Sequence, residues 1–193
     1  MEIRIALVIL HVIGTVLGAG AATVTDFLFF KFAKDGRLDR DEYDIIKATS
    51  SIVWIGLFLL LTSGFGFMVL YLADYGSTQI DYSLNKIWAK FVIVAILLCN
   101  GFVLHYKVLP LFAARLNKTF ATPQFIKKST VIFTAGAISG VSWYSALILG
   151  AWRGFEASVT TILIYYGIVL IGAIIVSNIA GRYLLHHIRR HPH

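Results

Sequence analysis

Five long apolar stretches constrain the fold of this chain more than any other feature of its sequence. They cover about residues 4–32, 50–73, 88–112, 129–152 and 159–185. A bilayer core of about 30 Å takes roughly 20 residues of α-helix at 1.5 Å per residue, so each stretch is long enough to cross it. Hydrophobic residues make up 58% of the 193 and charged residues only 14%, which excludes an ordinary soluble domain. The sequence predicts an all-α, five-helix transmembrane bundle that forms one domain over residues 1–193.

The distribution of lysine and arginine predicts how the bundle is oriented. Thirteen of the 17 Lys and Arg residues fall between the first two spans, around the end of the third, and in the C-terminal tail; four fall on the opposite side. Because positively charged loops stay in the cytoplasm, we expect the N-terminus outside and the C-terminus in the cytoplasm, in the cell inner membrane. The same topology explains the net charge of +7, so we expect the lipid bilayer and no nucleic acid as a partner.

The connection between the first two spans, about residues 33–49, reads as a cytoplasmic helical hairpin. Asp35-Gly36 is typical of a tight turn, with Gly36 in the left-handed conformation that ends a helix. Asp39 and Glu42 have the spacing of a capping box, so the second helix is expected to begin near Asp39. We expect the tip of this hairpin to be exposed to solvent.

Polar side chains inside the spans are the candidate functional residues, because they are costly in lipid and usually face the interior of a bundle. The first span carries such residues on one face at helical spacing: His11, Thr15, Gly18, Ala22, Thr25 and Asp26. One hypothesis is a close-packed helix contact in which the threonines bond to their own helix and Asp26 pairs with Lys31. The other is a functional face on which Asp26 carries a proton.

The third span contains LLCNGFVLHYKVLP, where Asn100 and His105 interrupt an apolar run. The two residues are five apart and point about 140° away from each other, so they do not easily share one small site. Asn100 either bridges helices by hydrogen bonds or supports a site. His105 is expected at the inner side, at a depth similar to that of Asp26, Thr25, Ser177 and Asn178, where a polar cluster is the alternative to simple packing.

Two pairs of glycines are expected to allow another helix backbone to approach closely. Gly14 and Gly18 form one small-xxx-small step, and Gly136 and Gly140 form another. Either face is a candidate contact between two copies of the chain.

Two segments resemble small bacterial membrane bundles. LHVIGTVLGAGAA in the first span and KFVIVAILLCNGFVLHYKVLP in the third are similar to the copper-resistance type D domain and, more remotely, to the haem-dependent membrane protoporphyrinogen oxidase. The resemblance covers about residues 1–113. It implies that His11 matches the first-helix histidine of these families and binds haem or a metal.

Three functions stay open at this point. The first is a membrane redox protein that binds a b-type haem, with His11 and His105 as candidate ligands and Asp26 and Asn100 as supporting groups; their predicted depths differ by about 10 Å, which is unfavourable for two axial ligands of one iron. The second is a small transporter or proton pathway through His11, Asp26 and His105. The third is an accessory subunit of a membrane assembly.

Overall fold

The computed structural model describes residues 2–33, 36–73, 84–120, 122–152 and 154–190. All regular structure in these ranges is helical. The elements are α1 (Glu2–Ala33), α2 (Arg40–Ala73), α3 (Leu84–Val103), the π-helical segment η1 (Leu104–Val108), α4 (Leu109–Ala113), α5 (Pro123–Ala151) and α6 (Val159–Arg190).

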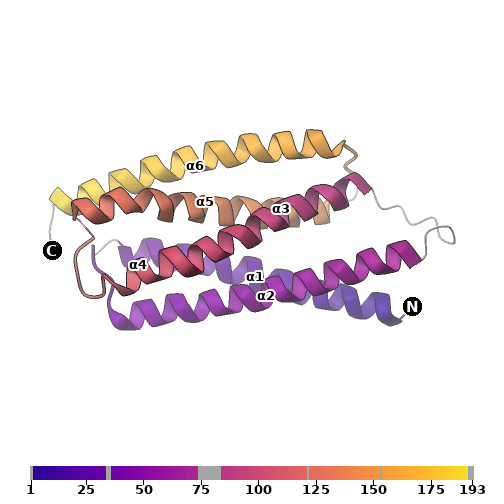
Figure 1. The fold of residues 1–193 in the computed structure, drawn as a ribbon, viewed down its shortest axis with the longest axis horizontal. Coiled ribbons are helices and arrows are strands. Elements are labelled where there is room, and N and C mark those ends of the chain that lie inside the picture. Colours follow the sequence, from indigo (N-terminus) through magenta and orange to yellow (C-terminus); the bar gives the residue numbers. More distant parts are fainter. Residues whose placement is uncertain (1, 34–35, 74–83, 121, 153, 191–193) are drawn as a thin grey trace.

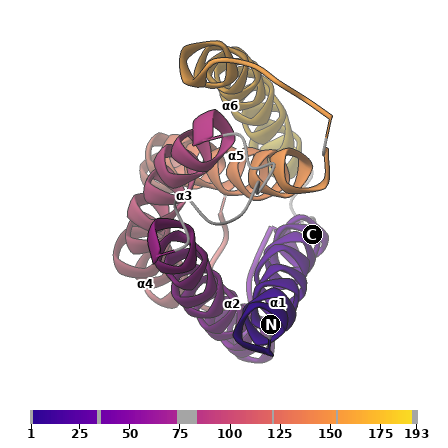
Figure 2. The ribbon, with the colours of Figure 1, turned by 90° about the vertical axis from the view of Figure 1, so that its right-hand side faces the viewer.

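Five helices in the described ranges are long and apolar enough to cross a membrane, and α3, η1 and α4 together make one of them. They run side by side in alternating directions (Figure 1). Seen from the end that holds the N-terminus, α1, α2, α3 and α5 are arranged around a common axis, and α6 lies outside them against α5 (Figure 2). The predicted number of spans is confirmed.

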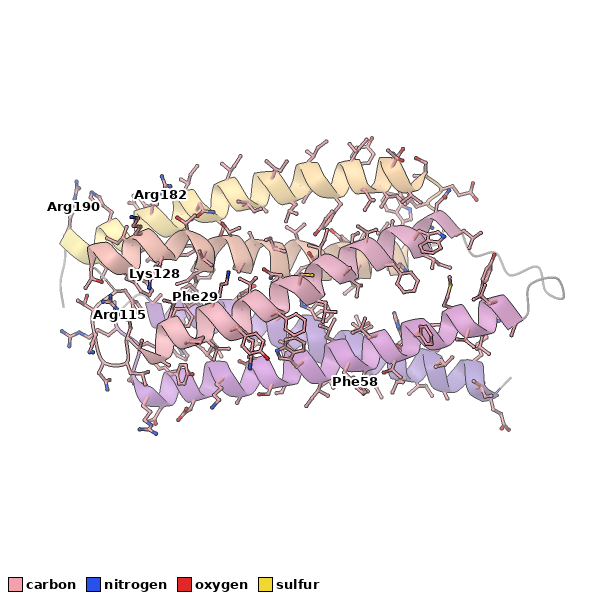
Figure 3. All side chains as sticks on the ribbon, viewed as in Figure 1. Phe29, Phe58, Arg115, Lys128, Arg182 and Arg190 are labelled. Atoms are coloured by element: carbon pink, nitrogen blue, oxygen red, sulfur yellow. The ribbon has the colours of Figure 1, made fainter. Side chains whose placement is uncertain are left out.

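Large apolar side chains cover the outside of the bundle. Phe58 of α2 is 68% exposed and points away from the other helices (Figure 3), and Phe27 and Val176 are similarly exposed. A water-soluble monomer rarely exposes apolar surface on this scale, whereas the lipid tails of a bilayer cover it without cost. The chain therefore has the construction of a multi-pass helical membrane protein.

The chain reversal between α1 and α2 has the predicted turn chemistry. Gly36 has a φ of 69°, and its N–H bonds to the carbonyl of Ala33 at 3.1 Å. Glu42 N–H donates to Asp39 Oδ1 at 2.8 Å, and Asp39 N–H donates to Glu42 Oε2 at 3.1 Å. These two bonds form a capping box, and α2 begins at Arg40, directly after Asp39.

The prediction that the tip of this hairpin is exposed to solvent holds for Arg37, Asp39 and Arg40, whereas Gly36 and Leu38 are buried. Leu38 is 2% exposed and belongs to a cluster with Phe112, Phe120 and Ile188. The next loop also bonds to the hairpin, because Phe120 N–H donates to Gly36 O and Asn117 N–H to Leu38 O, both at 2.8 Å. The apolar side chain of Leu38 and these backbone bonds hold the hairpin against the bundle.

The third span contains a π-helical turn, η1, immediately before Pro110. Leu109 N–H bonds to Leu104 O, five residues earlier, instead of to the usual carbonyl four residues earlier. Proline lacks an N–H and its ring crowds the preceding turn, which favours such a widening of the helix. The extra residue in this turn changes the direction in which His105, Tyr106 and Lys107 point relative to an ideal α-helix.

Candidate functional site

The seam between α1 and α2 is closed by glycines. A Cβ added at Gly56 would clash with Gly18 N and would lie 2.8 Å from Gly14 O, and one added at Gly14 would lie 2.9 Å from Leu60 N. The two backbones are therefore in direct contact, as small residues allow in membrane helices. Within one chain, the Gly14/Gly18 face packs against α2 and Trp143.

Trp143 of α5 occupies the centre of the bundle. Its ring lies directly against Gly18, where a Cβ would clash with it. It is 3% exposed and packs in one cluster with residues of three other helices: Ala19, Ala22, Leu57 and Leu97. Its Nε1–H is buried and has no hydrogen-bond partner in the described ranges. We call Trp143 and this cluster the central seal, because together they fill the middle of the bundle.

His11 lies on the N-terminal side of the central seal, and a hydrogen bond to α2 orients it. Its Nδ1 is 2.9 Å from Ser63 Oγ, and its ring meets the edge of Phe67. Ser63 is 0% exposed, and its hydroxyl can donate its single hydrogen to the carbonyl of Leu59 at 2.7 Å. When the Ser63 hydroxyl donates to this carbonyl, its Oγ accepts from His11 Nδ1–H and Nε2 is the available ring nitrogen; in the other tautomer Nδ1 accepts from the hydroxyl.

Lys90 of α3 lies at the same depth as His11. Its Nζ is 3.6 Å from the Cβ position of Gly150, which is seven residues from Trp143 along α5. His11 is also seven residues from the contact of Gly18 with Trp143, and α1 and α5 run in opposite directions (Figure 1). Moving two helical turns from the central seal toward the N-terminus of α1, or toward the C-terminus of α5, therefore leads to the same depth in the bundle. His11 and Gly150 both lie at this depth. Lys90 is also within electrostatic range of the His11 ring.

Asp26 lies on the other side of the central seal, and it has no partner. Among the described residues, its carboxylate forms no hydrogen bond and no ion pair, so the predicted pair with Lys31 is not formed. Asp26 is seven residues after Ala19 and four after Ala22, so it continues the face of α1 that packs against Trp143. Its side chain is half-buried.

Two glycines of α5 lie opposite Asp26. The seam between α1 and α5 is fixed at one end by Gly18 against Trp143 and at the other by Phe29 against Phe133, with ring centroids 6.0 Å apart. Asp26 lies between these contacts on α1, and Gly136 and Gly140 lie between them on α5. No heavy atom lies within 4 Å of a Cβ position at either glycine. In the described part of the chain, these glycines therefore have no packed neighbour, on the stretch of α5 that runs past the segment of α1 with Asp26.

Aromatic rings close the seam beyond Asp26. Phe29 lies 5.4 Å from Phe112, Phe112 lies 6.4 Å from Phe120, and Phe120 stacks on Phe125 at 4.7 Å between ring centroids. Phe133 joins them from α5. We call these five phenylalanines the inner seal. Asp26 is thus held between the central seal and the inner seal.

Asn100 reaches the same level from α3. Its Nδ2 donates to Ala135 O of α5 at 2.9 Å, and the residue is 5% exposed. This is the interhelical bond that the packing hypothesis for Asn100 predicts. Ala135 is the neighbour of Gly136, so Asn100 and Asp26 border the same part of the bundle from different helices.

The other predicted site residues do not join Asp26 in one cluster. Thr25 donates to Ala21 O of its own helix at 2.7 Å. Asn178 of α6 donates to Thr134 Oγ1 at 3.0 Å, and Ser177 donates to Phe133 O at 2.9 Å, so both hold α6 against α5. These bonds leave each of the three groups engaged in helix packing.

His105 lies apart from His11. It is exposed on η1, where its ring meets the edges of Trp54 and Tyr106. Trp54 and Ser63, the α2 contacts of the two histidines, are nine residues apart, which corresponds to about 14 Å along the helix. The structure does not bring the two histidines together as axial ligands of one haem. Within the described ranges there is also no group of three or more His, Cys, Asp or Glu side chains with the geometry of a metal site.

Sequence reasoning did not single out Ser63, Lys90 or Trp143 as site residues. A serine inside a span and a lysine near the end of one are common, so neither Ser63 nor Lys90 carries a signal of its own. Trp143, however, follows a run of small residues, AGAISGVS, in which no other side chain could fill the centre of a bundle.

Comparisons with protein-family models, with curated proteins and with solved structures gave no match to this chain.

Proposed function

We propose that the protein is a small transporter of the cell inner membrane, in which Asp26 takes up and releases a proton or a cation. In this proposal the N-terminus lies outside, because the basic residues gather at the opposite end of the bundle. Arg115, Lys128, Arg182 and Arg190 are at that end (Figure 3). Asp26 then lies in the cytoplasmic half of the membrane.

The observation that supports this proposal is the unpaired carboxylate of Asp26 between two hydrophobic seals. A carboxyl group inside a membrane span is costly and is rarely kept for packing alone. None of the described residues supplies a cation or a hydrogen-bond donor to it, and among them no heavy atom lies within 4 Å of the Cβ positions of Gly136 and Gly140. Such an arrangement suits a group that changes its charge state during a transport cycle.

The two seals suggest how access is controlled. Rearrangement of Trp143 would connect Asp26 to the side of His11 and Lys90, and rearrangement of the inner seal would connect it to the cytoplasm. In this proposal, closed seals isolate the carboxylate from both sides of the membrane. Alternating movement of the seals would carry a proton across without forming an open channel.

Proton flux into liposomes tests this proposal. Purified protein is reconstituted with a pH-sensitive dye inside, and a potassium gradient with valinomycin drives proton entry. We expect Asp26→Asn to abolish the flux that the wild-type protein supports. Asp44→Asn, an exposed carboxylate at the start of α2, is the matched control and should keep it. Equal flux for wild type and Asp26→Asn would reject the proposal and favour an accessory subunit.

A b-type haem on His11 is the second candidate function. The bond between Nδ1 and Ser63 Oγ favours it, because the tautomer with the hydrogen on Nδ1 leaves Nε2 available, as in most metal-binding histidines. A bound haem would supply a reducible iron, and His11 would hold it from α1. Optical spectra of the oxidised and dithionite-reduced protein, purified from cells supplied with haem, test this candidate. Reducible α and β bands that are lost in His11→Ala would support it, and a spectrum without a Soret band would reject it.

A further inference from the structure

The region of His11, Ser63 and Lys90, which we call the outer polar site, is a second place where a charged group has no counter-ion among the described residues. His11 comes from α1, Ser63 from α2, and Lys90 from α3 beside Gly150 of α5. The four helices that surround the central axis thus all contribute to this level (Figure 2). Lys86, one turn before Lys90, is anchored nearby by a bond from its Nζ to Trp152 O at 2.8 Å.

The ammonium group of Lys90 has no counter-ion in the described part of the chain. It forms no hydrogen bond and no ion pair there, although its side chain is half-buried. The described carboxylates on this side of the central seal are Glu2 and Glu156, both exposed. Glu2 is nine residues from His11, about 14 Å along α1. Neither residue bonds to Lys90.

An unpaired ammonium group within a span is unfavourable unless water or an anion compensates it. Lys90 offers three N–H donors, and Lys86 adds to the positive charge on one side of it. His11 becomes a second donor through Nε2 whenever it is protonated. Donors on two facing helices at one depth have the arrangement that carboxylates and phosphates require, because these anions accept several charge-assisted hydrogen bonds at once.

We propose that the outer polar site binds an oxyanion, a carboxylate or a phosphate, between Lys90 and His11. The anion is either a small free molecule or the headgroup of an anionic lipid. This inference does not depend on the proposed transport by Asp26, because the anion is held on the other side of the central seal. If both are correct, the anion is the substrate class that moves together with the proton.

Binding is measured on the full-length protein in neutral detergent by thermal unfolding. Sodium phosphate and sodium acetate are titrated against sodium chloride at constant ionic strength. We expect phosphate or acetate to raise Tm to a saturating value, and the midpoint concentration to increase about tenfold or more in Lys90→Gln and less in His11→Gln. Lys90→Arg, which keeps the charge, should retain the response, and Lys128→Gln, exposed at the opposite end, should behave like the wild type.

Nanodiscs distinguish the two sources of the anion. The site is assigned to a lipid headgroup if phosphatidylglycerol stabilises the protein more than phosphatidylcholine does, while free anions do not stabilise it. The stabilisation by phosphatidylglycerol should then be lost in Lys90→Gln. The inference is wrong if the wild type shows no saturable response to phosphate, acetate or phosphatidylglycerol. It is also wrong if Lys90→Gln responds like the wild type. Because neither outcome involves flux, failure of this inference is separate from failure of the transport proposal.

Discussion

Two seams run along α1, and both contain glycines, yet only one of them is closed. Toward α2, the backbones at Gly14, Gly18 and Gly56 touch. Toward α5, no described atom lies within 4 Å of the Cβ positions of Gly136 and Gly140, and Asp26, on the neighbouring stretch of α1, has no partner among the described residues. The same residue type therefore serves close packing in one seam and leaves free space in the other.

This difference shows why a glycine pattern alone does not distinguish packing from function. Backbone contact gains van der Waals energy in lipid, where no hydrophobic effect drives helices together. A seam that leaves its glycines uncovered gives up that energy. The α1–α5 seam does so at the level of the unpaired Asp26, which is the reason to connect its free space with function.

Adding one methyl group to each seam should give the largest difference in stability between the two seams. Gly56→Ala places a Cβ against the backbone of Gly18, which cannot move aside as a side chain could, so we expect a loss of about 3 kcal/mol, the upper end for overpacked sites. Gly136→Ala meets open space and should change stability by less than about 0.5 kcal/mol. Thermal unfolding in detergent compares the two variants. Similar destabilisation by both would remove the distinction between the seams.

A bulky residue in the open seam should affect transport more than stability. Gly136→Leu fills the space beside Asp26 and should reduce proton flux about tenfold, which corresponds to about 1.4 kcal/mol in the barrier. The protein should still fold, since the space is free in the wild type. Gly20→Leu is the control, because Gly20 also has no atom within 4 Å of its Cβ position but is exposed on the outside of α1. Unchanged flux in Gly136→Leu would mean that the proton pathway does not pass through the space at Gly136.

The smallest effect is expected for Trp143→Phe, in the central seal between the two polar levels. This substitution keeps most of the ring and removes the buried Nε1–H, which has no partner among the described residues. The loss of ring volume and the removal of an unsatisfied donor act in opposite directions, so stability should change by about 1 kcal/mol or less. Trp143→Ala leaves a cavity and should cost about 3–5 kcal/mol. Equal losses in both variants would mean that the N–H does have a partner in the folded protein.

Local chemistry explains which features of the fold were predictable. The five spans follow from runs of apolar residues long enough for a bilayer, and the capping box of Asp39 and Glu42 follows from side chains three residues apart. The burial of Leu38 was not predicted. It depends on Phe120, which lies more than 80 residues away in the sequence, and no residue pattern within the hairpin predicts that contact.

The candidate site was predictable only in part, for a similar reason. Asp26, His11 and Asn100 stand out in the sequence because each interrupts an apolar helix. The pairing of Asp26 with Lys31 and the grouping of His105 with Asn178 were suggested by depth alone. Depth along a helix does not specify which neighbour a side chain faces, and a π-helical turn such as η1 changes that direction without a clear sequence signal.

By itself, the sequence determined that this protein is a bundle of five membrane-spanning helices, because the length and apolarity of each segment leave the backbone no other way to satisfy its hydrogen bonds in lipid. It also determined the ends of the first hairpin, through Gly36 and the capping box. Only the tertiary structure decided which glycine face is closed, that Trp143 separates Asp26 from His11, and that Lys90 reaches the level of His11. These outcomes depend on how four helices meet around one axis, and contacts between distant segments set that geometry.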